Sequence, residues 1–403
     1  MISFELDSDQ TLIQETVHAF AKDELVPSIR AAEKTGAPSD ALRRSYGELG
    51  LARIDLPEGQ GGAGATISTA VLAEEELGWG DAALALALDP GYAGELAIAL
   101  LADDKRRAQL APGPGTVTAV AYCETKGQPA GFATVARRVD GGFSLTGRKG
   151  FVLDGARATR YVVFAQLEGG DGWRGAAAFL VDRPAKGDKQ ASSIRVGERQ
   201  QQLGLAAASV TEVVFEDCRV GEGALLAAGD ELVAGTRRLL ARVGLKNAAR
   251  QVGLARASYE LTLEYTQDRK AFGRPVAHFQ ANAFTLAEML IDVEAARWLV
   301  WRAAWLVDRM AATPTASDDL RACADAIVHA HEVAWRTADR GVQLLGGAGF
   351  VQDFPAEKRM RDSKALALVG APSEWWRLDA AAQLLGHAIE SALPSAALQP
   401  FVL

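Results

Sequence analysis

The hydrophobic pattern of this 403-residue chain changes twice along its length, and this change limits the possible folds more than any single motif. Apolar residues recur at helical spacing in residues 9–101 and again in residues 230–345. Between these blocks, short alternating or β-branched runs are separated by turn residues, as in a β-barrel or sandwich. The sequence therefore predicts a mainly α protein with a β insert: an N-terminal helical domain at 1–114, a central β-barrel at 115–228 and a C-terminal four-helix bundle at 229–403.

Individual elements follow from the same patterns. In the first part, helices are predicted at 11–29, 39–49 and 66–78, with Pro27 expected to kink or end the first and Ser39 to cap the second. In the middle part, Asp140-Gly141-Gly142 indicates a hairpin, and strands are predicted at 116–122, 143–146, 161–165, 176–181 and 211–215. Long helices are predicted at 231–268, 278–310 and 317–345. One stripe of the second long helix indicates a packed helix–helix contact: Trp298, Trp301 and Trp305.

Composition and charge exclude several classes of protein. The net charge of -8 and the pI near 5.4 argue against a nucleic-acid binder, although a local cluster could still bind a polyanionic ligand. The three cysteines have no paired spacing, which suits a reducing compartment, and no metal site is expected. The N-terminus lacks the features of a signal peptide, and no apolar run reaches the ~20 residues that a membrane span requires. We therefore expect a cytoplasmic protein.

Two stretches in the C-terminal part carry the most specific signals. The first has the pattern YxxxRxxFG at residues 265–273, and the second has the pattern QxxGGxG at residues 343–349. Both resemble signatures of the acyl-CoA dehydrogenase family of flavoproteins. The order of helical domain, β domain and bundle also matches the layout of that family over essentially the whole chain.

The resemblance implies FAD-dependent α,β-dehydrogenation of an acyl thioester, carried by CoA or by an acyl-carrier protein. In this family, FAD lies between subunits of a tetramer, and one subunit supplies an arginine to the FAD pyrophosphate of its neighbour. A guanidinium suits this role because it stays charged and offers two donors to a phosphate. The resemblance implies FAD contacts at Arg269, Phe272, Gln280, Gln343, Gly346 and Gly347 and, in the β domain, at Thr125 and Leu153.

The chain departs from the family pattern at the catalytic base. Typical members have a glutamate that removes the α-proton of the thioester, which requires a carboxylate in a desolvated pocket. Counting forward from Asp362 or back from Arg377 places Gly370 at that position. A minority of members carry the glutamate on the first long helix, where this chain has Val243. Glu374 is the nearest acid to the usual place and is a candidate substitute base.

The β domain has also lost residues that hold the flavin in the family. The threonine that lies beside the flavin ring is replaced by Leu153, and the glutamate of the motif around Thr125 is replaced by Lys126. Since the residues that reach a neighbour's FAD are kept, we predict a subunit that completes the FAD site of a catalytic paralogue in a heterotetramer. Two alternatives stay open: a self-sufficient, homo-oligomeric flavoenzyme that uses Glu374 or altered chemistry, and a non-enzymatic scaffold.

Overall fold

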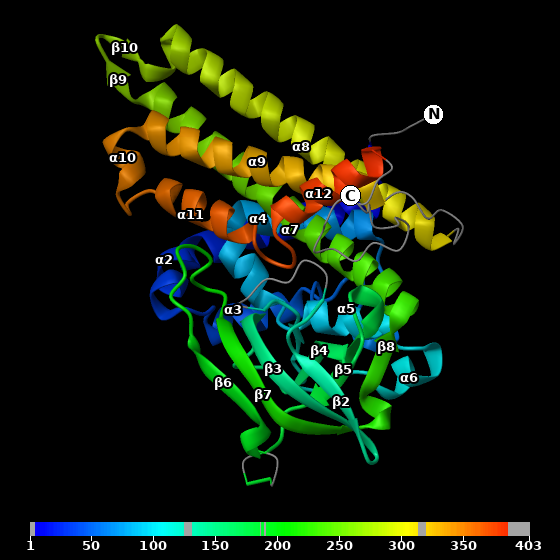
Figure 1. The fold of residues 1–403 in the computed structure, drawn as a ribbon. Helices are drawn as coiled ribbons and strands as arrows, with labels where there is room; N and C mark the ends of the chain where they lie inside the picture. The colour runs from blue at the N-terminus through cyan, green and yellow to red at the C-terminus, as the bar shows by residue number, and fades with distance from the viewer. Residues whose placement is uncertain (1–4, 125–130, 186, 189–190, 313–319, 386–403) are drawn as a thin grey trace.

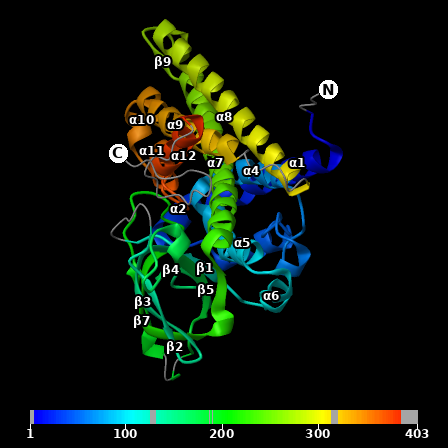
Figure 2. The ribbon, with the colours of Figure 1, turned by 45° about the vertical axis from the view of Figure 1, so that its right-hand side comes forward.

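The computed structural model describes residues 5–124, 131–185, 187–188, 191–312 and 320–385 and contains the three predicted parts. Figure 1 shows the helical bundle at one end of the molecule and the sheet at the other. Figure 2 shows the N-terminal helices beside both of these parts. All three parts contact α7 (Gly229–Asp268), the longest helix, so this helix is the common wall of the molecule.

The N-terminal part confirms the predicted helices but differs at Pro27. The side chain of Ser39 caps its helix as predicted, because its Oγ accepts a hydrogen bond from the Leu42 amide at 3.2 Å. Pro27 does not end the first helix, which passes through a π-helical turn (Ala21–Leu25). Pro27 lies in the first turn after it, where no amide donor is needed. The helices are α1 (Ser8–Phe20), α2 (Val26–Thr35), α3 (Asp40–Glu48), α4 (Ile67–Leu88), α5 (Tyr92–Leu101) and α6 (Asp104–Gln109).

Helix α4 breaks at Asp81, whose φ of -164° and ψ of 119° are not helical, so its first segment ends close to the end predicted at Gly78, and a second helical segment runs on to Leu88. A side chain at Gly78 would collide with the backbone of Arg250 on α7, and one at Gly253 on α7 would collide with the backbone of Glu75. The two glycines therefore allow α4 and α7 to cross at close range. No single described helix is long and apolar enough to cross a membrane, and the pair that reaches that length together, α4 with α5, is bent by 66°.

The middle part is one sheet with the strand order β6-β7-β3-β2-β4-β5-β8, and β1 runs parallel to β4. The predicted hairpin is confirmed, since Val139 and Gly142 pair across the turn. The predicted central β domain is confirmed as a sheet, and within the described residues no pairing joins its end strands β6 and β8 into a closed barrel. The strands are β1 (Thr118–Ala121), β2 (Val135–Val139), β3 (Gly142–Leu153), β4 (Arg160–Leu167), β5 (Ala176–Asp182), β6 (Ile194–Arg199), β7 (Val210–Gly221) and β8 (Leu225–Ala228).

The C-terminal part packs three long helices against two shorter ones, which together take the fourth place of the predicted bundle. A small hairpin, β9 (Lys270–Ala271) with β10 (Arg274–Pro275), joins α7 to α8. The start of the helix predicted at 317–345 lies outside the described residues. The remaining helices are α8 (Gln280–Ala312), α9 (Leu320–Leu345), α10 (Gly347–Phe350), α11 (Ala356–Leu366) and α12 (Ser373–Leu385).

The tryptophan stripe of α8 was predicted to lie in a helix–helix contact, and Trp301 lies in such a contact with α4. The indole of Trp301 is half-buried and donates to a carboxylate oxygen of Glu75 at 3.3 Å. Trp298 and Trp305 are 39% and 48% exposed. Residues seven apart lie on the same side of a helix, and here that side faces away from the rest of the chain.

Candidate functional site

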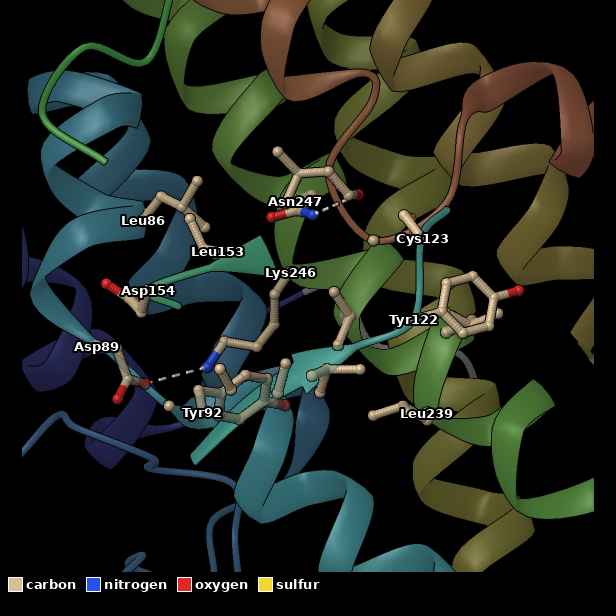
Figure 3. A pocket seen from close by; sticks show the side chains of 18 of the residues that line it. Leu86, Asp89, Tyr92, Tyr122, Cys123, Leu153, Asp154, Leu239, Lys246 and Asn247 are labelled. Carbon is tan, nitrogen blue, oxygen red and sulfur yellow. Dashed lines mark hydrogen bonds and ion pairs between the residues drawn. The ribbon is translucent and has the colours of Figure 1, made fainter. Parts of the chain in front are cut away.

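A cavity of about 110 Å³ lies where the three parts meet (Figure 3). Its walls come from the end of α4 and the start of α5, from β1 and β3, from α7, and from the loop before α12. Figure 3 shows Leu86, Asp89 and Asp154 towards one end of this cavity, and Tyr122 and Cys123 towards the other.

The two residues expected from the sequence at the family's base positions meet in this cavity. Both Gly370 and Val243 line it, and a Cβ on Gly370 would lie 3.0 Å from Cγ1 of Val243. Gly370 has a φ of +86°, which favours glycine, and the loop is held from α7 by Asn247, whose amide donates to the Val369 carbonyl at 3.1 Å. Neither position provides a carboxylate.

Glu374 lies elsewhere. It is an exposed residue in the first turn of α12 and is not among the residues that line the cavity. Its neighbour Trp375 is half-buried and packs edge-on to Tyr122, with ring centroids 6.3 Å apart. The structure therefore places the carboxylate of Glu374, the candidate substitute base, outside the cavity.

A buried lysine on α7 organises one wall of the cavity. The Lys246 ammonium lies 3.0 Å from Glu74, 3.4 Å from Asp55 and 3.9 Å from Asp89, and 3.6 Å from the centroid of the Tyr92 ring. Burial disfavours the charge of Lys246, but the surrounding carboxylates outweigh it and raise its pKa well above the ordinary value. Lys246 is therefore a charged residue inside the protein.

Two arginines of α7 complete this network. Arg250 pairs with Glu74 at 2.6 Å, and Arg242 pairs with Asp55 at 2.6 Å. Burial alone would raise the pKa of Asp55, but Lys246 and Arg242 overcome that effect and lower its pKa to about 2. Three cations of one helix thus neutralise three carboxylates of the N-terminal part.

Asp154, at the end of β3, is a cavity-lining carboxylate outside that network. It is only 4% exposed, and its side chain makes no hydrogen bond or ion pair with any described residue. Burial raises the pKa of Asp154 to about 6, against the opposing charges of Arg157 and Arg43 and with a further contribution from Asp89. The residue has a φ of +57°, a conformation that aspartate and asparagine adopt more readily than other side chains.

Replacing Asp154 by asparagine is expected to stabilise the protein above pH 6. The folded pKa lies above the usual value of about 4, so the carboxyl costs stability progressively as the pH rises from about 4 to about 6. The shift corresponds to about 3 kcal/mol at pH 7.5, and the cost vanishes below pH 4. Urea unfolding at several pH values measures it. The exposed residue Asp182 gives a matched control, and a gain that does not depend on pH would contradict this assignment.

A second group of residues lies at the far end of the bundle. Arg269 follows the last turn of α7, about 33 Å along that helix from Asn247 at 1.5 Å per residue. Phe272 is 96% exposed, and Gln280 is exposed at the start of α8. Tyr265 packs on Phe354 with ring centroids 5.6 Å apart, which brings the two sequence motifs to the same end of the molecule (Figure 1).

Comparisons with known proteins agree with this architecture. The sequence matches three family models: acyl-CoA dehydrogenase N-terminal domain at residues 7–113, middle domain at 124–218 and C-terminal domain at 236–385. This chain belongs to the acyl-CoA dehydrogenase family. An acyl-CoA dehydrogenase of Bacillus subtilis (strain 168) is 32% identical over 387 residues, which are 94% of this chain and 98% of that protein.

Other relatives extend the similarity. A probable short/branched chain specific acyl-CoA dehydrogenase of Dictyostelium discoideum is 30% identical over 370 residues, which are 89% of this chain and 86% of that protein. The structure of butyryl-CoA dehydrogenase from Megasphaera elsdenii superposes with a TM-score of 0.85 at 26% identity, covering 95% of this chain and all of that one. The prolyl acyl carrier protein oxidase AnaB shares the fold at 21% identity, with a TM-score of 0.84, covering 95% of this chain and all of that one.

The family uses FAD, and the far-end group fits such a cofactor. Arg269 offers an exposed cation for a phosphate, and Phe272 offers an exposed aromatic ring. A Cβ placed on Gly346 or Gly347 would meet no atom within 4 Å, so the backbone there is open to a ligand, and Gln343 beside it is exposed. No described group of histidine, cysteine or acidic residues is placed to hold a metal ion.

The structure also places the β-domain residues and shows what the sequence motifs missed. Leu153 lines the cavity, whereas Thr125 lies outside the described residues. The motif-based prediction did not include Lys246 or Asp154, because neither belongs to a recognised pattern. Nothing local distinguishes Lys246 from the other polar residues of its helix, and Asp154 follows a strand without any motif.

Proposed function

We propose that this chain is a subunit of an FAD-dependent acyl-CoA dehydrogenase assembly, in which it completes the FAD site of a catalytic partner. The observation that carries the proposal is the absence of a carboxylate at both Gly370 and Val243, which meet in the cavity of this chain. The exposed group around Arg269 supports it, since this group lies too far along α7 to serve the chain's own cavity.

In the proposed assembly the chemistry is divided between two kinds of chain. Bound FAD supplies the acceptor for the hydride that leaves the thioester. This chain contributes Arg269 to hold the cofactor's phosphates and exposed glycine backbone at Gly346 and Gly347 for close approach. The proton-abstracting carboxylate belongs to the catalytic paralogue, because the loop at Gly370 has no side chain that could remove a proton.

The outer face of α8 supports association with another subunit. Four of its exposed large apolar side chains repeat every seven residues along the helix and form a stripe, and the exposed Leu290 lies beside it. A contiguous apolar surface of this kind marks an interaction site in soluble proteins. The stripe is formed by Phe284, Ile291, Trp298 and Trp305.

The visible absorption spectrum of the purified chain tests the proposal through its FAD-to-protomer ratio. Alone, the chain is expected to contain little FAD and to show no oxidation of acyl-CoA substrates. Co-expressed with a paralogue that has the glutamate, it is expected to co-purify as a heterotetramer containing FAD and activity. The paralogue expressed alone is the control for cofactor that does not need this chain.

A self-sufficient flavoenzyme is the second candidate. The observation in its favour is that the cavity does contain two carboxylates, on Asp89 and Asp154, although neither lies at a position where the family carries its base. Stoichiometric FAD and turnover in the homo-oligomer would establish this alternative and overturn the proposal. Loss of FAD from every combination of chains would instead favour a non-enzymatic scaffold.

A further inference from the structure

The charge balance of the cavity is the starting point. Lys246, Arg242 and Arg250 on α7 face three acids of the N-terminal part, at separations between 2.6 and 3.9 Å. The ammonium of Lys246 is fully engaged, because it already contacts three carboxylates and the ring of Tyr92. This network is therefore neutral and leaves no cation free to pair with another acid.

Asp154 adds one negative charge that this network does not neutralise. Asp154 lines the cavity, is 4% exposed as a residue, and its carboxylate has no hydrogen-bond or ion-pair partner among the described residues. Arg43 and Arg157 influence its charge without contacting it: Arg43 donates instead to the Ala87 carbonyl at 3.2 Å, and Arg157 is exposed. A buried, unpaired carboxylate is costly, and a bound group that carries the opposite charge removes that cost.

We infer that the cavity binds an acyl thioester whose short acyl chain ends in a protonated amine, with Asp154 as the acceptor for the ammonium group. This inference rests on the proposed function in taking an acyl thioester as the ligand, and it concerns binding of that thioester in this chain's own cavity rather than its turnover there. An organic cation fits better than a metal ion, since no described cluster of acidic, histidine or cysteine side chains is placed to bind one.

The size and lining of the cavity fit a short chain. Its volume of about 110 Å³ exceeds the roughly 10–15 Å³ that a single water molecule needs. The apolar side chains of Leu86, Leu153 and Val243 line it and can enclose methylene groups. Asp154 lies at the same end of the cavity as Asp89 (Figure 3), and because Asp89 already pairs with Lys246, Asp154 is the carboxylate at that end that is left to accept a ligand's positive charge.

Three thioesters of equal length test the inference on the full-length chain by isothermal titration calorimetry. β-Alanyl-CoA, 3-hydroxypropionyl-CoA and butyryl-CoA differ only in whether the acyl chain ends in an ammonium, a hydroxyl or a methyl group. We expect β-alanyl-CoA to bind about tenfold to a hundredfold more tightly than butyryl-CoA, because it forms a charge-assisted hydrogen bond in a buried site. 3-Hydroxypropionyl-CoA is expected to lie between the two.

Asp154→Asn is expected to abolish the preference for the ammonium ligand while leaving the affinity for butyryl-CoA within about twofold, since asparagine tolerates the same backbone conformation. Asp182→Asn, on the protein surface, is the matched control and is expected to keep the preference. Equal affinity for the three thioesters, no binding of any of them, or a preference that survives Asp154→Asn would overturn the inference.

These measurements need no turnover and do not depend on FAD. A preference for β-alanyl-CoA in a chain that proves self-sufficient would retain the inference and overturn the proposed function. A chain that completes a partner's FAD site but binds butyryl-CoA as tightly as β-alanyl-CoA would retain the proposed function and overturn the inference.

Discussion

Replacing Lys246 by methionine is expected to lower the free energy of unfolding by about 3–5 kcal/mol, the cost of breaking a buried charge network from one side. Methionine keeps much of the aliphatic chain, but it leaves Asp55, Glu74 and Asp89 with one cation fewer. It also removes the ammonium from the face of the Tyr92 ring. Urea unfolding followed by tryptophan fluorescence measures the effect.

Two comparisons separate the charge network from a simple loss of packing. Lys270→Met on the exposed hairpin after α7 is the matched control and is expected to leave the urea midpoint unchanged. Adding Asp89→Asn to Lys246→Met is expected to recover part of the loss, because the ion pair of Asp89 is with Lys246 and the double variant removes the carboxylate that has lost this cation. A midpoint for Lys246→Met equal to that of Lys270→Met would show that the lysine contributes nothing to stability.

Replacing Arg269 by alanine is expected to weaken retention of FAD in the co-expressed assembly on the order of a hundredfold. The expected loss follows from removing hydrogen bonds between a guanidinium and phosphate oxygens, which are stronger than neutral ones. The helical fold should be unaffected, since Arg269 is exposed and lies beyond the last turn of α7. The FAD-to-protomer ratio after gel filtration and the dissociation constant for added FAD measure the change.

The neighbouring residue provides the control for this second result. Lys270→Ala removes an adjacent exposed cation and is expected to leave the FAD ratio unchanged. Arg269→Lys is expected to recover only part of the affinity, because lysine keeps the charge but not the two-donor geometry. An unchanged FAD-to-protomer ratio in Arg269→Ala would show that Arg269 is a solvated surface charge. It would also remove a main support of the proposed function.

Local patterns in the sequence were enough to predict the architecture. The change from helical to alternating periodicity marks the β insert, and the cap at Ser39 and the turn at Asp140-Gly141-Gly142 were read from their own side chains and backbone preferences. The counts along the chain that located Gly370 and Val243 used separate motifs, and the structure places these two residues in contact. Motifs far apart in the sequence therefore predicted two positions that are neighbours in the structure.

Local sequence patterns did not predict the burial of charged side chains that are neutralised by residues far away along the chain. Glu74-Glu75-Glu76 is an acidic run in the sequence, yet all three side chains are buried in the structure. Cations from α7 and α8 neutralise them, and these cations lie well over a hundred residues away along the chain: Lys246, Arg250, Arg256 and Arg297.

The sequence by itself thus determined the order of the three parts, the two family motifs at the end of the bundle and the glycine at position 370. Only the tertiary structure decided that Lys246 is charged inside the protein, that the Asp154 side chain has no partner within the described part of the chain and that Glu374 lies outside the cavity. The physical reason is that hydrophobic periodicity and turn preference act over a few residues. The free energy of a buried charge instead depends on every group around it in space.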